Sequence, residues 1–294
     1  MDRLEAMSIL VAIAETGSLS AAGRRLNLPL SSVSRKISDL EAHLKTRLLT
    51  RTSRQAALTD AGRAYLVACK RILEDVAEAE RAAAGEYASP RGGLTLTAPI
   101  VFGRLHVLPV VLDFLAAFPE VDISLRLIDH RVSLVEEHID LALRIGPLAD
   151  SSLVAVKLGT MRRVVVAAPS YLERRGRPKV PADLAHHDCI DSTSRPTSDW
   201  TFDAFLPRRS RLDVNTAEAS IDAAIAGAGL TRALFYQAAQ AVHEGKLVLL
   251  LEEFEHDPWP VSLVHAGQGL LPLKLRAFID FAAPALRTRL AQIG

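Results

Sequence analysis

The sequence predicts a multidomain protein with a helix-rich amino-terminal domain, a long linker helix and an α/β region in two lobes. Short segments with helical spacing of apolar residues fill the first 50 residues or so. Apolar residues at alternating spacings of four and three follow Asp60, and strand and helix patterns alternate after Gly93. We expect domains at 1–59, 60–88 and 89–294, with lobe I at about 92–161 and 266–294 and lobe II at about 162–265.

Composition narrows the class of protein. Hydrophobic residues make up 49% of the 294 residues, so the chain can bury sizeable cores, and 35 basic and 34 acidic residues leave a net charge of only +1. Any nucleic-acid affinity must therefore come from a local patch. Two cysteines without metal-ligand spacing predict a reducing cytoplasm with neither a disulfide framework nor a zinc site, and we expect no cofactor. Acidic residues near the amino terminus and the lack of a run of about 20 apolar residues predict neither a secretory signal nor a membrane span.

The first two helices are bounded by local signals. Apolar residues line one face of the first helix, which Gly17 and Ser18 end. Ser18 or Ser20 can cap the second helix. Asn27 tolerates left-handed backbone geometry, so we expect the chain to turn there before a third helix.

The third helix has a polar and basic outer face. Its apolar residues recur at helical spacing and should pack inward, leaving Ser31, Ser34, Arg35 and Ser38 on another face. From Arg24 to Arg54 there are eight basic residues against two acidic ones. Serine hydroxyls and an arginine on the second helix of a helix-turn-helix suit the major groove of double-stranded DNA. An ordinary solvated helix face is the alternative for this helix taken alone.

A predicted wing and a predicted dimerisation helix follow. LLTRTSRQAALT reads as two short strands around a turn at 52–55 with arginines at its tip, and a long helix begins near Asp60. That helix carries coiled-coil spacing, which predicts a homodimer; its candidate seam residues are Tyr65, Cys69, Ile72, Val76 and Ala79. Cys69 could cross-link a dimer or pack as a small apolar side chain. Gly85 and ASPRGG should end the helix.

The remaining residues alternate between strand and helix patterns. The predicted strands are LTLTA, DISLRLI, DLALRI, RRVVVAAP, RLDVN and LTRAL. The predicted helices are LHVLPVVLDFLAAF, SLVEEHI, one near YLERRG, AEASIDAAIAGAG, and a last one from Leu273 to about Leu290. Units of this kind look like those of parallel sheets and suggest two lobes with a cleft between them.

The chain also resembles a known family. AMSILVAIAETGSLSAAGRRL, SSVSRKISDLEAHL and RLLTRTSRQAALTDAGRAYL are similar to the winged helix-turn-helix of LysR-type transcriptional regulators, and LPVVLDFLAAFPEVDISL, EEHIDLALRIGPLADSSLVA and LRAFIDF extend the likeness over essentially the whole chain. The resemblance implies a homodimer or homotetramer that binds operator DNA through the winged domain. It also implies a two-lobed effector domain like that of periplasmic binding proteins, and contact with RNA polymerase as a further partner.

The DNA-binding prediction covers the turn, the third helix and the wing. Here Pro29, Leu30 and Ser31 replace the Ser-Gln-Pro or Ser-Pro-Ser of many relatives, and Gly23 replaces a common alanine. Leu30 could instead meet a thymine methyl group. The flanking arginines can reach phosphates. The candidate residues are Ser20, Arg24, Leu30, Ser31, Ser32, Ser34, Arg35, Lys36, Ser38, Arg51, Thr52 and Arg54.

The effector prediction rests on the family pattern and on the usual place of ligands in open α/β folds, beyond the carboxyl ends of strands. Helix starts at that edge favour anions, so a carboxylate-bearing small molecule is one candidate. A plain surface loop is the alternative for the segment 191–198, as is a structural salt bridge for Arg144. The candidate residues are Ala98, Pro99, Ile100, Arg144, Ile145, Gly146, Ser192, Thr193 and Ser194.

The sequence lacks the usual catalytic and metal-binding motifs. His186, His187, Asp188 and Cys189 are potential metal-ligand types, but adjacent positions rarely converge on one ion, and we expect no metal. GxSxG, HExxH, Walker A and GxGxxG are missing, so we expect no enzyme. The rival hypothesis is an α/β enzyme or transport-type binding protein with an accessory helical domain.

Overall fold

The computed structural model describes residues 2–51, 56–83, 89–130, 132–148, 153–192, 209–267 and 271–293. The chain divides into two compact units, residues 1–88 and residues 89–294. Each unit has its own hydrophobic core and is described separately below.

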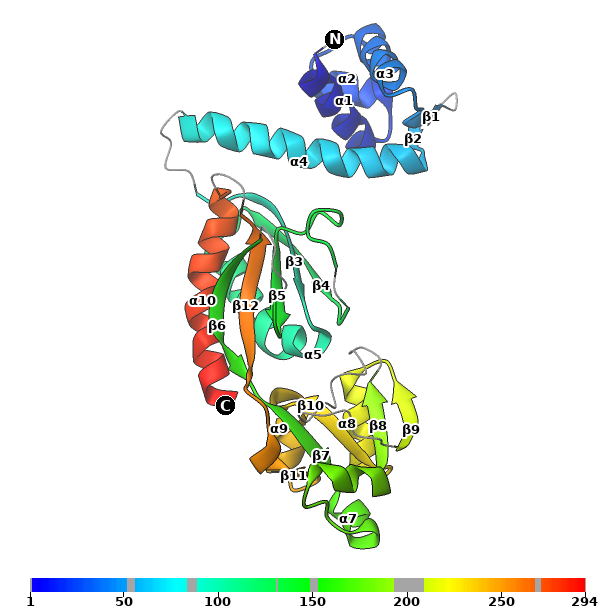
Figure 1. Ribbon diagram of the computed structural model, residues 1–294. Helices are drawn as coiled ribbons and strands as arrows, with labels where there is room; N and C mark the ends of the chain where they lie inside the picture. The colour runs from blue at the N-terminus through cyan, green and yellow to red at the C-terminus, as the bar shows by residue number, and fades with distance from the viewer. Residues whose placement is uncertain are drawn as a thin grey trace. The chain divides into compact units, whose positions relative to one another are not determined.

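The amino-terminal unit is a helix-turn-helix with a two-stranded wing and a long following helix (Figure 1). Its elements are α1 (Arg3–Thr16), α2 (Leu19–Arg25), α3 (Leu30–Leu44), β1 (Leu49–Arg51), β2 (Ala56–Leu58) and α4 (Asp60–Ala83). Gly17 ends α1 in the left-handed conformation, and the Ser18 hydroxyl accepts a hydrogen bond from the Ala21 N–H at the start of α2. Asn27 is left-handed with φ 54°, so the chain turns where the sequence predicts it.

The core of this unit joins α1 to the inner faces of the other elements. Val33, Ile37 and Leu40 of α3 are fully buried in it, as their spacing predicts. Gly23 of α2 lies against the turn, where an added Cβ would stand 2.8 Å from the Leu28 carbonyl oxygen. An alanine at this position would therefore require the backbone of the turn to shift.

Lobe I of the second unit is built on a five-stranded sheet of order β4-β3-β5-β12-β6 (Figure 1). The strands are β3 (Gly92–Ala98), β4 (Val121–Leu127), β5 (Leu141–Ile145), β6 (Leu153–Met161) and β12 (Trp259–Ala266). β3 pairs in parallel with β4 and β5, whereas β12 is antiparallel to β5 and β6. The sheet is therefore mixed rather than parallel throughout.

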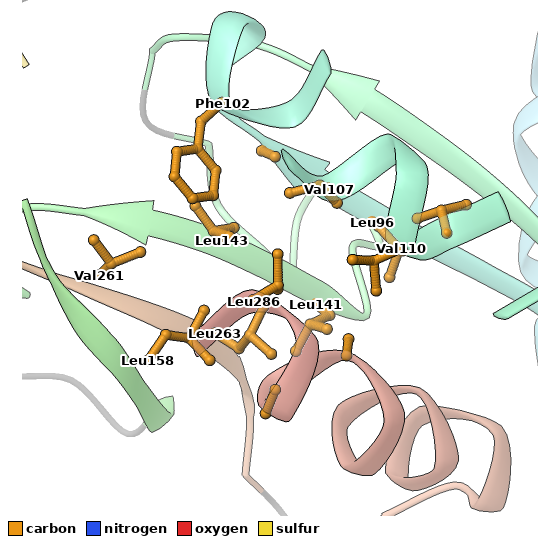
Figure 2. Close-up of a cluster of buried hydrophobic side chains, with 14 of the residues drawn as sticks. Leu96, Phe102, Val107, Val110, Leu141, Leu143, Leu158, Val261, Leu263 and Leu286 are labelled. Atoms are coloured by element: carbon orange, nitrogen blue, oxygen red, sulfur yellow. The ribbon is translucent and has the colours of Figure 1, made fainter. Parts of the chain in front are cut away.

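Helices pack their apolar residues onto the lobe I sheet. They are the continuous stretch α5 (Ile100–Phe102), η1 (the π-helical turn Gly103–Val107) and α6 (Leu108–Ala117), and the carboxyl-terminal α10 (Leu273–Ile293). Figure 2 shows side chains of this core, among them Phe102, Leu141 and Leu286. Within the described residues, Ile100–Ala117 has the length and mean hydropathy (1.8) of a membrane span, and 39% of it is buried in the unit; α1 and α2 pass the same test only as a pair bent by 115°.

Lobe II is built on a second five-stranded sheet, of order β11-β7-β10-β8-β9. Its strands are β7 (Arg163–Ala167), β8 (Asp188–Ser192), β9 (Arg209–Val214), β10 (Leu230–Leu234) and β11 (Val248–Leu250). Its helices are α7 (Pro169–Arg175), η2 (Pro181–His186), α8 (Ala217–Ile225), α9 (Phe235–His243) and η4 (Glu252–Phe254). β8 is parallel to β9 and β10, and β7 is antiparallel to β10 and β11.

Two details of the predicted organisation were wrong. SLVEEHI does not form a helix: its residues make turns, and His138 takes the left-handed conformation with φ 52°. The predicted lobe II included residues 259–265, but these belong to β12 in the lobe I sheet. The chain therefore passes between the lobes after β6 and again before β12, and the second passage precedes Trp259.

Candidate nucleic-acid interface

The outer face of α3 is exposed and polar in the structure. Ser31, Arg35 and Ser38 are exposed on the side of the helix opposite the buried residues, and Leu30 is 52% exposed at its start. Ser32 and Ser34 are half-buried at the edges of this face. Because most of these side chains are short, the helix can approach another surface closely while Arg35 extends from it.

The basic residues near this face fall into two groups. Arg24 and Arg35 are exposed and make no ion pair within the part of the chain that the structure describes. Lys36, in contrast, forms an ion pair with Glu5 of α1, and the two side chains are only 23% and 36% exposed. Lys36 was predicted to bind DNA, but its position makes it first a link between α3 and α1.

Ion pairs also join the other helices of the unit. Arg25 Nη1 lies 2.7 Å from a Glu15 carboxylate oxygen, and Lys70 Nζ lies 3.5 Å from the other oxygen of that carboxylate. Glu15 thus connects α1 to both α2 and α4. These pairs are largely exposed, so each contributes little to the free energy of unfolding. They nevertheless engage Arg25 and Lys70 with an acid of the same unit, whereas a count of basic residues alone would leave both cations available to DNA.

The remaining predicted DNA contacts lie partly outside the described residues. β1 and β2 form the predicted antiparallel wing, with Arg51 opposite Ala56. Thr52 and Arg54, at the predicted tip, lie outside the described residues, and of Arg51 only the backbone is described. Ser20 is exposed in the first turn of α2.

One predicted seam residue of α4, Cys69, points into the core of the amino-terminal unit rather than away from it. Cys69 is fully buried in the core with residues of α1, and burial raises the pKa of its thiol to about 11. Tyr65 also packs against this core, and burial raises the pKa of its phenol. Cys69 therefore packs as a small apolar side chain. Ile72 and Ala79 are exposed and Val76 is half-buried, so the prediction that these three face a partner helix stays open.

Some of the predicted effector residues of lobe I already have structural contacts within the lobe. The Ala98 side chain is 2% exposed in the core, and its carbonyl oxygen accepts a hydrogen bond from the Ile128 N–H at 2.9 Å. Pro99 and Ile100 are half-buried at the start of α5, where the Ile100 N–H donates to Asp129 Oδ1 at 3.0 Å. Ala98 thus offers no side chain to a ligand, and a carboxylate of the chain already occupies the first amide of the helix.

The second predicted segment of lobe I follows β5. Arg144 Nη2 donates to the Val132 carbonyl oxygen at 2.7 Å, and Ile145 is half-buried at the end of the strand. Gly146 has φ 116° and lies beside the Trp259 ring, 3.2 Å from where its Cβ would be, so the position requires glycine. The described partner of Arg144 is therefore a backbone carbonyl, and its role toward an effector stays a prediction.

In lobe II, Ser192 ends β8 and is half-buried, whereas Thr193 and Ser194 lie outside the described residues. Within the described ranges no three His, Cys, Asp or Glu side chains are grouped to hold an ion. His187 Nδ1 instead lies 3.2 Å from the Tyr171 hydroxyl in the lobe II interior. Burial, followed by the charge of Arg175, lowers the pKa of His187.

No sequence pattern predicts the contacts that form where the chain passes between the lobes. Arg162 Nε and Nη2 each lie 2.9 Å from an oxygen of Glu255, and these hydrogen bonds raise the pKa of the guanidinium. Phe102 of lobe I meets Tyr236 of lobe II edge to face, with ring centroids 5.2 Å apart. These partners are separated by more than 90 residues, so no local pattern could have paired them.

Comparisons with known proteins cover both units. Residues 4–63 match the family described as bacterial regulatory helix-turn-helix protein, lysR family, and residues 88–287 match the LysR substrate binding domain. Within the first match lie the exposed face of α3 and the wing. Within the second lie both five-stranded sheets.

Whole-length relatives agree. The chain is 31% identical to the HTH-type transcriptional activator AaeR of Escherichia coli K12, covering 95% of this chain and 93% of that protein. It is 31% identical to an HTH-type transcriptional repressor of Pseudomonas aeruginosa, over 96% of this chain and 91% of that protein. Among solved structures, CrgA, a LysR-type transcriptional regulator from Neisseria meningitidis, matches with a TM-score of 0.60 and 30% identity, covering 96% of this chain and 98% of that chain. The chain belongs to the family of LysR-type transcriptional regulators, with a helix-turn-helix DNA-binding domain and a substrate-binding domain.

Proposed function

We propose that this regulator acts in the cytoplasm as a homodimer or homotetramer that grips operator DNA through α3 and the wing. A small molecule bound between the lobes of the second unit changes that grip. In an activating complex RNA polymerase would be a further partner; the relatives include both an activator and a repressor. An effector can act only through different affinities for two states of the assembly, so its coupling to DNA binding should be about 1–3 kcal/mol and reciprocal.

One observation carries the DNA part of the proposal. The outer face of α3 presents Ser31 and Ser38 around Arg35, a cation that makes no ion pair within the described residues. Arginine can hold guanine through two parallel hydrogen bonds, and serine can either donate to or accept from a base edge. A face that served only solubility would not need short side chains around one extended guanidinium.

Sequencing the genomic fragments that the purified full chain retains tests class and target together. We expect a small set of enriched fragments sharing a sequence, and we expect a chain lacking residues 1–60 to retain none. A retained pool that matches the input would contradict sequence-specific binding. Turnover of a metabolite by the full chain would instead favour the rival hypothesis of an enzyme.

For the effector, we propose that it meets the lobe I edge at Pro99 and Ile100 and the lobe II edge near Ser192. A substitution at Asp129 can reveal the charge of the effector, because the Asp129 carboxylate lies at that edge and accepts a hydrogen bond from the Ile100 N–H. If the effector carries a carboxylate, Asp129→Asn should remove a repulsion and tighten binding. If the effector presents a cation or a hydrogen-bond donor there, the same change should weaken binding. Isothermal titration with each candidate metabolite measures the sign, and an unchanged affinity would place the effector elsewhere.

A further inference from the structure

A surface hollow of about 420 Å3 lies at the carboxyl end of α3. It is lined by the last turns of the helix and the chain that leads to the wing: Ser38, Glu41, Ala42, Lys45, Thr46 and Arg47. Lys45 and Arg47 are two of the eight basic residues between Arg24 and Arg54, and no sequence motif distinguishes them from the others.

The hollow continues the outer face of α3. With 3.6 residues per turn, Ser38 follows Ser31 by about two turns and Ala42 by about three, so these residues share one side of the helix. Lys45 follows as the C-cap of α3, in the left-handed conformation with φ 52°, and lines the same hollow. A helix that spans Leu30–Leu44 is about 22 Å long, whereas the major groove is about 12 Å wide. When the amino-terminal half of α3 meets base edges, its carboxyl end therefore reaches the phosphates that border the groove.

The charges of the hollow favour an anion. Lys45 and Arg47 are exposed, and neither forms an ion pair within the described residues, unlike Lys36. The one acid, Glu41, is turned to the backbone: its Oε1 accepts hydrogen bonds from the Leu48 N–H at 2.8 Å and the Leu49 N–H at 3.0 Å. Glu41 therefore positions the segment that carries Arg47, while the two cations remain available.

We propose that Lys45 and Arg47 hold a backbone phosphate of the DNA at this hollow. The small side chains of Ser38 and Ala42 leave room for the phosphate to approach, and the two cations provide its charge-assisted hydrogen bonds. This inference rests on the proposed function of α3 as the helix that enters the major groove. It adds a contact that fixes the register of α3 without reading sequence.

The test compares full-length variants by fluorescence anisotropy on two duplexes, one selected from the retained genomic pool and one of mixed sequence. The variants are Lys45→Gln, Arg47→Gln and, as a matched control, Arg63→Gln, whose guanidinium pairs with Asp60 on α4. The salt slope is the slope of the logarithm of the binding constant against the logarithm of the salt concentration. Each lost phosphate contact should lower the magnitude of this slope by about 0.9 for every bound protomer. Between 50 and 200 mM salt, each variant should then lose about 3.5-fold less affinity per protomer than the parent chain does, on both duplexes. The control should keep the parent slope.

A second readout locates the phosphate. Replacing single phosphates of the selected duplex by neutral methylphosphonates should weaken the parent chain at one position per half-site. Arg47→Gln should be insensitive at that same position, because the contact is already lost.

Each outcome decides the inference. Slopes for Lys45→Gln and Arg47→Gln equal to that of Arg63→Gln would overturn it while leaving the proposed function intact. A loss confined to the selected duplex would mean that these residues read bases, which also overturns it. If the parent chain bound neither duplex, the proposed function itself would fail.

Discussion

Adjacent residues of α3, Arg35 and Lys36, should respond oppositely to replacement by alanine. Arg35 has no ion pair within the described residues, so its loss should be felt only at DNA. A bidentate contact to a base is worth about 1–3 kcal/mol, or about 5- to 150-fold in affinity. Lys36 already pairs with Glu5 in a partly exposed setting, so Lys36→Ala should cost about 0.2–1 kcal/mol of unfolding free energy and change operator preference little.

Two measurements separate these effects. Anisotropy on the selected and mixed-sequence duplexes gives the specificity ratio, which Arg35→Ala should lower and Lys36→Ala should keep. Urea unfolding gives stability, which Lys36→Ala should lower and Arg35→Ala should keep. Glu5→Gln is the matched control, because it breaks the same ion pair without removing a positive charge from α3. Equal losses of specificity in Arg35→Ala and Lys36→Ala, with unchanged stability in Glu5→Gln, would refute the division of the cations.

Three further predictions concern the core, the linker helix and lobe II. Gly62→Ala would place a Cβ 2.0 Å from the Leu48 carbonyl oxygen and should cost about 1–3 kcal/mol in urea unfolding, whereas Gly93→Ala meets no atom within 4 Å and should cost far less. Ile72→Asp should reduce the assembly seen by sedimentation, and an intact assembly would show that this exposed side chain faces solvent. Burial holds the pKa of His187 below its ordinary 6.5, so the unfolded chain binds a proton at this residue more readily than the folded chain does. The free energy of unfolding should therefore reach its full value above pH 6.5 and fall below that pH, and the fall should be smaller in His187→Gln. An equal pH dependence of the two proteins would contradict this.

Local signals made the amino-terminal unit predictable. The end of α1 depends on Gly17, the start of α2 on Ser18 and the turn before α3 on Asn27, and each acts within a few residues of its own position. The inward face of α3 follows from helical spacing alone. Such features need no knowledge of distant partners.

Distant partners decided what the sequence could not predict. β12 joins lobe I by antiparallel pairing with β5, more than 110 residues earlier in the chain, so lobe II appeared longer than it is. Lys36 and Arg35 are equivalent in the sequence pattern, but only Lys36 has Glu5 of α1 beside it. Cys69 has coiled-coil spacing, but the same side of α4 also packs on α1, and spacing cannot tell a partner protomer from the residue's own domain.

The burial of both cysteines has a practical consequence. Cys69 and Cys189 are each fully buried, and with a pKa of about 11 only about one Cys69 thiol in ten thousand is a thiolate at pH 7. Maleimide reagents and mild oxidants react with thiolates, so the native chain should stay unmodified under conditions that label an exposed thiol within minutes. A single cysteine introduced on each lobe, for instance at exposed Val135 and Leu212, could therefore carry a spectroscopic label without removal of the native thiols. Distances between such labels would report directly on how the lobes respond to candidate effectors.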